Sequence, residues 1–479
     1  MIEFIGFLYM LPILDVCLII LFLSATLVVG LCLKGKDTSA AGYLLGGRTL
    51  TLPAFVATTV STWYGGILGV GEYGWTYGIS NWLVFGVPYY VGAFLFAILL
   101  CRRARRGESL TLPERLEESY GAWIGKFSAV LVFLTSMPAA YMLIMGTLLS
   151  MTLGVSPVYG IVATALYIVI YLWRGGFSAV TKTDYFQCIM MFLGFMMLTG
   201  VLIFGEGASP LETLPESHWA PTGGQPIGSV LVWYIIALST LAEPNFFQRA
   251  FAAKTPDVAR KGLLVSILCW IIFDAMTTIC GLYARALLPD LDKPLLAFPK
   301  LAVEVLPSGL LGIFFIGMFA TVMSTLDSNL FTVATTFGCD IFSKKSKDLS
   351  KKLNENCEKR AKTRKNTIAR KTRIGLILAA ILSSALAICS DSVVSLWKIF
   401  GSISASALLI PIISTYYPPL RMSASGVFWL MSLSSLTTFG WFCVGKVLGQ
   451  EPFGVEPLFA GGTVSLIIFM IDKLRIRKK

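Results

Sequence analysis

Long apolar runs are the feature that most constrains this chain of 479 residues. A helix of about 20 apolar residues crosses the hydrocarbon core of a bilayer, and many stretches of this sequence reach that length almost without charge. Soluble proteins carry about 25% charged residues, whereas this chain carries 14%. The sequence therefore predicts an all-α polytopic membrane protein, and it excludes soluble enzymes and modules that bind nucleic acid.

Hydropathy predicts about thirteen membrane-spanning helices. Their expected ranges are 8–33, 52–77, 80–101, 123–153, 156–173, 184–204, 228–248, 262–288, 307–336, 374–390, 393–417, 424–446 and 457–472. Lys and Arg gather on alternate connections, including one that we expect to contain Arg249, as the positive-inside rule requires. We expect a multi-pass protein of the cell membrane with its N-terminus outside and its C-terminus in the cytoplasm.

Residues for covalent or metal-dependent catalysis are scarce. The only histidine, His218, lies in a polar loop, and the ten cysteines are scattered without a C-x-x-C pair. We therefore expect neither enzyme activity nor a cofactor. Any active chemistry must use hydroxyls, carboxylates and the backbone.

Two of the predicted spans contain residues that break helices. The second span is interrupted at residues 61–66 (STWYGG) and the seventh at residues 242–245 (AEPN). Such breaks are tolerated at membrane depth only where the freed backbone groups line a polar cavity. Because the two spans are five positions apart, they would belong to two halves of opposite orientation, which indicates a transport site near the midplane.

The ninth predicted span carries an oxygen-rich face. Thr321, Ser324, Thr325 and Ser328 follow the i, i+3, i+4, i+7 spacing and share one side of the helix, and Asp327 lies beside them. A carboxylate in the membrane is costly without a partner, and we expect that partner to be Asp184 of the sixth span. Hydroxyls and carboxylates are the ligands of a hard cation. The face therefore predicts a site for a monovalent cation.

Several motifs resemble those of the sodium/solute symporter family. They are residues 42–48 (GYLLGGR), 111–116 (TLPERL), 175–177 (GGF), 183–184 (TD), 246–254 (FFQRAFAAK), 323–326 (MSTL) and 340–341 (DI). The resemblance implies a LeuT-type inverted repeat of five plus five helices, with one helix in front and two behind.

The resemblance also implies a division of the chain into parts. The parts are an extra helix and cytoplasmic loop (1–50), the first repeat (51–205), an extracellular loop (206–227), the inverted second repeat (228–420) and two C-terminal helices with a basic tail (421–479).

The resemblance implies a central sodium site made of five oxygens. They are the carbonyls at about Thr59 and Thr62, the carbonyl of Thr321, and the hydroxyls of Ser324 and Thr325. Some family members hold a further sodium with the groups that match Asp184 and Ser328. Here Asp327 stands where a serine is expected, so a second ion, a proton or a structural pair of carboxylates all remain open.

The implied solute site lies between the two breaks. Its candidate residues are Trp63, Tyr64, Gly65, Ser239 and Thr240, with Phe85 and Ser404 as further candidates. Sugar-carrying members have a glutamate near the position of Phe85, which argues against a sugar recognised in that way.

The sequence and the resemblance together predict sodium-coupled symport of a small organic solute by alternating access. The alternatives are a proton-coupled symporter on the same scaffold and a transporter-like solute sensor. Residues 344–373, with 13 Lys/Arg against 3 Asp/Glu, are expected to be a disordered linker or a frayed helix. This segment either fixes the topology or binds anionic lipid.

Overall fold

The computed structural model describes residues 11–32, 40–342, 357–390 and 392–477. Within these ranges the secondary structure is helical, apart from one isolated bridge. The first half contains α1 (Ile13–Cys32), α2 (Ala40–Leu45), α3 (Leu52–Ser61), α4 (Ile67–Tyr77), α5 (Val87–Phe96), α6 (Arg102–Arg106), α7 (Leu112–Tyr120), α8 (Ala122–Thr135), α9 (Ala139–Leu153) and α10 (Pro157–Val201). The second half contains α11 (Ile227–Ile236), α12 (Pro244–Ala252), α13 (Pro256–Leu287), α14 (Ala297–Val305), α15 (Leu310–Thr336), α16 (Cys357–Ile388), α17 (Val393–Tyr416), α18 (Ala424–Leu448) and α19 (Pro457–Arg477).

The helices agree closely with the predicted spans. The described part of the chain has 11 helical segments that are long and apolar enough to cross a membrane. The second and fifth predicted spans correspond to two shorter apolar helices, Leu52–Ser61 and Pro157–Trp173. The fifth and sixth spans are continuous as α10, but Gly176 (φ 59°, ψ −160°) interrupts the helical geometry between them.

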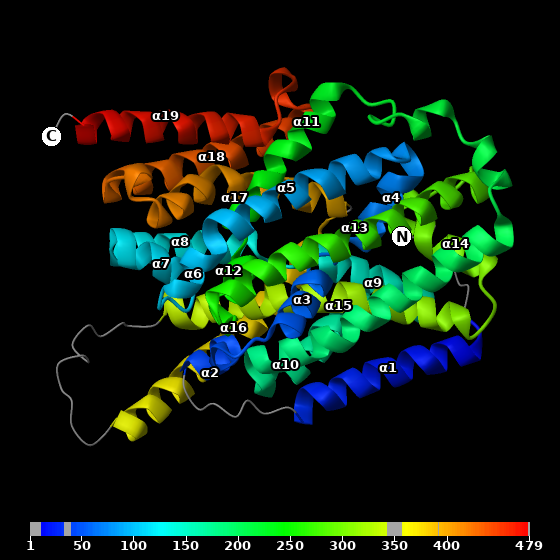
Figure 1. Ribbon diagram of the computed structural model, residues 1–479, viewed down its shortest axis with the longest axis horizontal. Helices are drawn as coiled ribbons and strands as arrows, with labels where there is room; N and C mark the ends of the chain where they lie inside the picture. Colours follow the sequence, from blue (N-terminus) through cyan, green and yellow to red (C-terminus); the bar gives the residue numbers. More distant parts are fainter. Residues whose placement is uncertain (1–10, 33–39, 343–356, 391, 478–479) are drawn as a thin grey trace.

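The core is built around α15. In the most apolar stretch of 18 residues within Leu310–Ile341, 89% of the residues are buried. In the equivalent 18-residue stretches of α1, α18 and α19, 28% of the residues are buried. Figure 1 shows α1 on one side of the molecule and α18 and α19 on the other. The helix before the predicted repeats and the two after them are therefore peripheral, and α15 is central.

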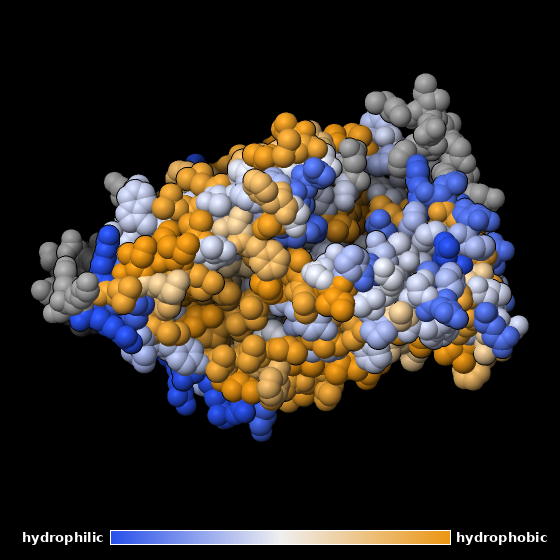
Figure 2. Space-filling view, turned by 90° about the horizontal axis from the view of Figure 1, so that it is seen from above, coloured by the Kyte–Doolittle hydropathy of each residue, from blue (hydrophilic) through white to orange (hydrophobic). Residues whose placement is uncertain are grey.

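The surface has the polarity that a bilayer requires. Figure 2 shows a broad apolar band across the middle of the visible face, with hydrophilic residues gathered at both ends of the long axis. In Figure 1, α1 begins at the right-hand end of the same axis and α19 finishes at the left-hand end. Because the spans run along this axis, the described ends of the chain lie on opposite sides of the band.

Both predicted breaks are present. The first lies between α3 and α4, and the second separates the short 3-10 turn Ala237–Ala242 from α12. At the second break Glu243 is the N-cap of α12 and its carboxylate accepts a hydrogen bond from the Asn245 amide, while Pro244 occupies the first helical position, where no amide is needed. Each broken span thus presents helix ends to the protein interior.

The two broken spans are joined through the main chain. The Leu50 amide donates to the Ala252 carbonyl (3.1 Å), and the Lys254 amide donates to the Leu50 carbonyl (2.9 Å). These bonds form an isolated parallel bridge between Leu50 and Ala253. The segment that enters α3 is therefore attached to the end of α12.

The basic connection is partly described. From Cys357 onward it forms the first turns of α16, which continues into the tenth span, so this portion is helical. Residues 344–356 lie outside the described residues.

Candidate ion and solute site

Hydroxyl groups of α3 and α15 meet at the centre of the protein. Thr58, Ser61 and Thr62 follow the i, i+3, i+4 spacing on α3, so they share one face, and all are buried. The hydroxyl oxygens of Ser324 and Ser61 are 2.7 Å apart, and those of Thr62 and Ser328 are 3.1 Å apart. The predicted oxygen-rich face of α15 thus lies against the helix that precedes the first break.

A glycine at the first break permits this close approach. A Cβ atom at Gly65 would lie 2.5 Å from Cβ of Thr325, so a larger residue would push the helices apart. The structure therefore gives Gly65 a packing role beside the predicted ion ligands.

The oxygens around Thr325 are spaced as ligands of a cation would be. Its Oγ1 lies 3.5 Å from the Ser61 carbonyl oxygen and 3.4 Å from the Thr321 carbonyl oxygen. Oxygens about 2.4 Å from a hard cation stand about 3.4 Å apart along an octahedral edge. Thr321 and Thr325 therefore lie one helical turn apart on α15, and the nearby carbonyl on α3 is that of Ser61. Thr59, whose carbonyl is another predicted ligand, has a buried hydroxyl without a hydrogen-bond partner within the described ranges.

Asp184 of α10 lies beside this cluster and is fully buried. Its carboxylate accepts hydrogen bonds from the hydroxyls of Ser324 (2.6 Å) and Thr58. The carboxylate therefore connects α10 to both α3 and α15.

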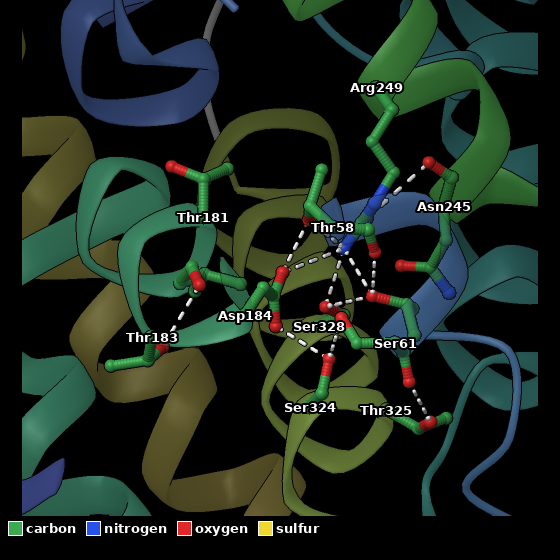
Figure 3. Close-up of polar contacts among 12 residues, drawn as sticks. Thr58, Ser61, Thr181, Thr183, Asp184, Asn245, Arg249, Ser324, Thr325 and Ser328 are labelled. Atoms are coloured by element: carbon green, nitrogen blue, oxygen red, sulfur yellow. Dashed lines mark hydrogen bonds and ion pairs between the residues drawn. The ribbon is translucent and has the colours of Figure 1, made fainter. Parts of the chain in front are cut away.

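Arg249 of α12 is the partner of Asp184, and the sequence analysis missed it. Our prediction that it lies in a cytoplasmic connection is wrong, because its side chain is 1% exposed and its Nη2 is 3.6 Å from Asp184 Oδ2. Figure 3 shows the guanidinium pointing into the hydroxyl cluster. Its Nη2, which has two hydrogens to donate, lies within hydrogen-bond distance of the hydroxyl oxygens of Ser328 (2.6 Å), Thr62 (2.7 Å) and Thr58 (3.2 Å).

Asp327 occupies a different position from the predicted one. It is fully buried, and within the described ranges neither carboxylate oxygen has a hydrogen-bond partner. Asp184 instead contacts Thr58, Ser324 and Arg249. The structure therefore does not show the expected pairing of Asp184 with Asp327.

A cavity of about 230 Å³ lies between the two breaks. Five predicted solute residues line it: Trp63, Tyr64, Phe85, Ser239 and Ser404. Gly65 and Thr240 are not among its lining residues. Six of the other lining residues are aromatic, and the sequence analysis did not find them: Tyr89, Tyr141, Trp233, Phe246, Trp397 and Phe400.

The cavity wall combines these rings with two carboxylates. The Trp63 ring lies 5.3 Å from those of Tyr89 and Phe246. Asp274 accepts a hydrogen bond from the Tyr90 hydroxyl, and Glu243 accepts one from the Asn245 side-chain amide (2.9 Å). A mostly apolar wall with a few fixed polar groups is typical of a small-molecule site.

Two broken helices, a cluster of oxygens and an adjoining cavity form the arrangement that is typical of a secondary transporter. The family model described as "Sodium:solute symporter family" matches residues 43–433. The chain therefore belongs to the sodium:solute symporter family, whose coupling ion is Na⁺, and the resemblance seen in the sequence is confirmed.

Curated relatives and solved structures agree with this assignment. The sodium/pantothenate symporter of Haemophilus influenzae is 25% identical over 93% of this chain and 92% of its own length. The high-affinity choline transporter 1 of Caenorhabditis elegans is 23% identical over 94% and 80%. A substrate-bound, outward-open Na⁺-coupled sialic acid symporter has the same fold, with a TM-score of 0.78 at 18% identity over 98% of both chains.

Proposed function

We propose that this protein carries out sodium-coupled secondary active symport of a small organic solute across the cell membrane. The observation that supports it best is the convergence of α3 and α15 oxygens beside a cavity that lies between the two breaks. In this mechanism the central oxygens bind sodium, the cavity binds the solute, and rocking of the two repeats exposes both alternately to each side. The N-terminus is outside and the C-terminus is cytoplasmic.

The proposed central sodium site consists of the carbonyls near Thr59 and Thr62, the Thr321 carbonyl and the hydroxyls of Ser324 and Thr325, with the Ser61 carbonyl as an added candidate. Each inward sodium gains about 2.3 kcal/mol per 100 mV of membrane potential, before any concentration gradient. The chain needs no covalent chemistry to concentrate a solute, because this electrical work is enough.

The solute is small, and the wall that would contact it combines aromatic rings with two carboxylates. A cavity of about 230 Å³ lies below the range of about 300–1,000 Å³ that drug-sized ligands occupy. The named relatives transport different solutes, so kinship alone does not choose among them.

The proposed function is tested by uptake of labelled solutes into proteoliposomes under an inward sodium gradient. We expect accumulation of at least one solute that collapses when sodium is replaced by potassium. Accumulation that is independent of sodium would contradict the proposal.

Proton coupling is a second candidate, and the unpartnered carboxylate of Asp327 favours it. A buried carboxylate without a partner or bound ion is costly when charged, so it is suited to carry a proton. If protons drive transport, uptake occurs at zero sodium under a pH gradient, and Asp327→Asn abolishes it. If sodium alone drives transport, Asp327→Asn leaves the pH profile of uptake unchanged. The pH profiles of both proteins in liposomes decide between these outcomes.

The basic segment 344–373 is proposed to bind anionic headgroups beside the membrane. Each Lys or Arg close to the surface contributes about 1 kcal/mol to this attraction. Six residues of the described helical part suit replacement by Gln: Lys359, Arg360, Lys362, Arg364, Lys365 and Arg370. We expect the sixfold variant to retain at least 10-fold less phosphatidylglycerol through purification, with unchanged sodium affinity. Mass spectrometry of the retained lipid measures this, and retention that does not respond to salt would leave only the topological role.

A further inference from the structure

The cavity between the two breaks has acidic side chains in its wall and no basic ones. Glu243 and Asp274 line it, and within the described ranges no Lys, Arg or His side chain does. Arg249 of α12 lies outside this lining, and its guanidinium interacts more strongly with Asp184 than with Glu243. Ionised carboxylates at membrane depth are costly without a partner, so the cavity favours a positively charged solute.

Glu243 has one oxygen available to a bound solute. Its Oε1 accepts hydrogen bonds from the backbone amide (3.3 Å) and the side-chain amide (2.9 Å) of Asn245, which fix the carboxylate at the start of α12. Among the described residues no donor reaches Oε2. The carboxylate is therefore held in place at the cavity wall with one oxygen unused, as a counter-charge for a cation requires.

Aromatic side chains make up much of the rest of the wall. An aromatic face attracts a cation within about 6 Å of the ring centroid, and cavities lined by several rings recognise quaternary ammonium groups. The rings form two groups with centroids 4.8–6.4 Å apart, Phe85 with Trp233 and Trp397, and Trp63 with Tyr89 and Phe246. This wall suits a solute whose positive charge is spread over an alkyl surface.

A solute carboxylate would find both helix ends at the breaks already covered. Helix N-termini at such breaks attract the anionic groups of solutes. At α12 this end is capped by the Glu243 carboxylate. At α4 the Trp397 ring lies against the first turn, since a Cβ atom at Gly66 or Gly69 would stand 1.9 Å or 3.0 Å from it. The chain itself therefore closes the two positions where an anionic group would bind best.

We propose that the solute is a small organic ammonium ion without a carboxylate. Glu243 supplies its counter-charge, and the two ring groups contact its alkyl surface. The carboxylates of the wall also offset the repulsion between this cation and a sodium ion in the adjoining oxygen cluster. This inference rests on the proposed function and specifies its solute class.

The experiment compares probes of similar shape and different charge. Choline has a quaternary ammonium group, 3,3-dimethylbutan-1-ol has an uncharged carbon in place of the nitrogen, and glycine betaine keeps the nitrogen but adds a carboxylate. Butylammonium extends the comparison to protonated amines. Isothermal titration calorimetry measures binding to the purified full-length protein in detergent, in sodium and in potassium buffer. In sodium we expect choline or butylammonium to bind at least about 10-fold more tightly than the uncharged and the carboxylate-bearing probes.

Glu243→Gln tests the counter-charge. The substitution keeps an oxygen that can accept from Asn245, so the cap of α12 is retained while the charge is lost. We expect the affinity for the preferred cation to fall at least about 10-fold and the affinity for the uncharged probe to stay unchanged. Asp472→Asn, which alters a buried carboxylate outside the cavity lining, should change neither affinity.

The outcomes separate the solute class from the sodium coupling. Absence of binding by both cations overturns the inference, as does equal or tighter binding of glycine betaine or of the uncharged probe, and these comparisons need no variant to fold. A Glu243→Gln protein that loses affinity for every probe alike also overturns it, because the residue then acts only on the structure. An equal affinity for the cation in sodium and in potassium contradicts the sodium-coupled function and leaves the solute class standing.

Discussion

Replacing Ser324 and Thr325 together by alanine is expected to weaken sodium activation of transport at least about 100-fold. Both hydroxyls face α3, and Thr325 lies within 3.5 Å of two carbonyl oxygens. A polar contact to a charged group contributes about 1.5–3 kcal/mol, so the loss of two such ligands costs about 3 kcal/mol or more in sodium affinity. The half-saturating sodium concentration for uptake into liposomes measures the effect.

A matched control separates ion binding from packing. Ser383 and Ser384 of α16 are also adjacent and buried, and within the described ranges their hydroxyls have no hydrogen-bond partner. Ser383→Ala with Ser384→Ala likewise removes two buried hydroxyl groups, from a helix outside the site, and should leave sodium activation unchanged. An ordinary sodium dependence in the Ser324 and Thr325 variant, or an equal loss in the control, would place the ion site elsewhere.

Asp184→Asn is expected to abolish sodium-driven accumulation and to destabilise the protein by about 3–5 kcal/mol. The substitution leaves the buried guanidinium of Arg249 without its counter-charge, and breaking one side of a buried ion pair has a cost of this size. It also removes a carboxylate oxygen that orients Ser324, one of the proposed sodium ligands. Uptake in liposomes and unfolding of the purified protein in detergent give the two readouts.

Asp472→Asn provides the comparison for a buried carboxylate outside the site. Asp472 accepts a hydrogen bond from the Ser423 amide (2.8 Å) at the start of α18, so its substitution perturbs stability alone. Combining Asp184→Asn with Arg249→Gln should recover part of the lost stability, because neither charge is then left unpaired. Stability losses that simply add in the double variant would show that the two residues do not interact.

The chemistry of the two breaks and of the α15 face could be predicted from the sequence. Glycine, proline and a series of hydroxyls are unusual within apolar spans, and the period of 3.6 residues places Ser324, Thr325 and Ser328 on one face. The membrane limits each span to a helix, so little freedom remains in the local structure. The predicted breaks and this face are accordingly seen in the structure.

The partners of these groups could not be predicted, because they depend on packing between distant segments. A basic residue after an apolar run is expected to lie at the membrane surface, and the count of charges along the chain cannot show that α12 turns Arg249 inward. Likewise, Asp327 and Ser328 are neighbours in sequence, but they project from α15 in directions about 100° apart. Trp397 reaches the cavity from α17, where it packs against Gly66 at the first break.

The bridge between Leu50 and Ala253 has a consequence for mutational scanning. Both of its hydrogen bonds use main-chain atoms, so replacing either side chain leaves donors and acceptors in place. An alanine or cysteine scan would therefore report only the packing of these two buried side chains, and not the hydrogen bonds that attach one broken span to the other. Proline alone among the natural residues removes a donor there, at Leu50 or at Lys254, so sensitivity to proline is the genetic signature of this attachment.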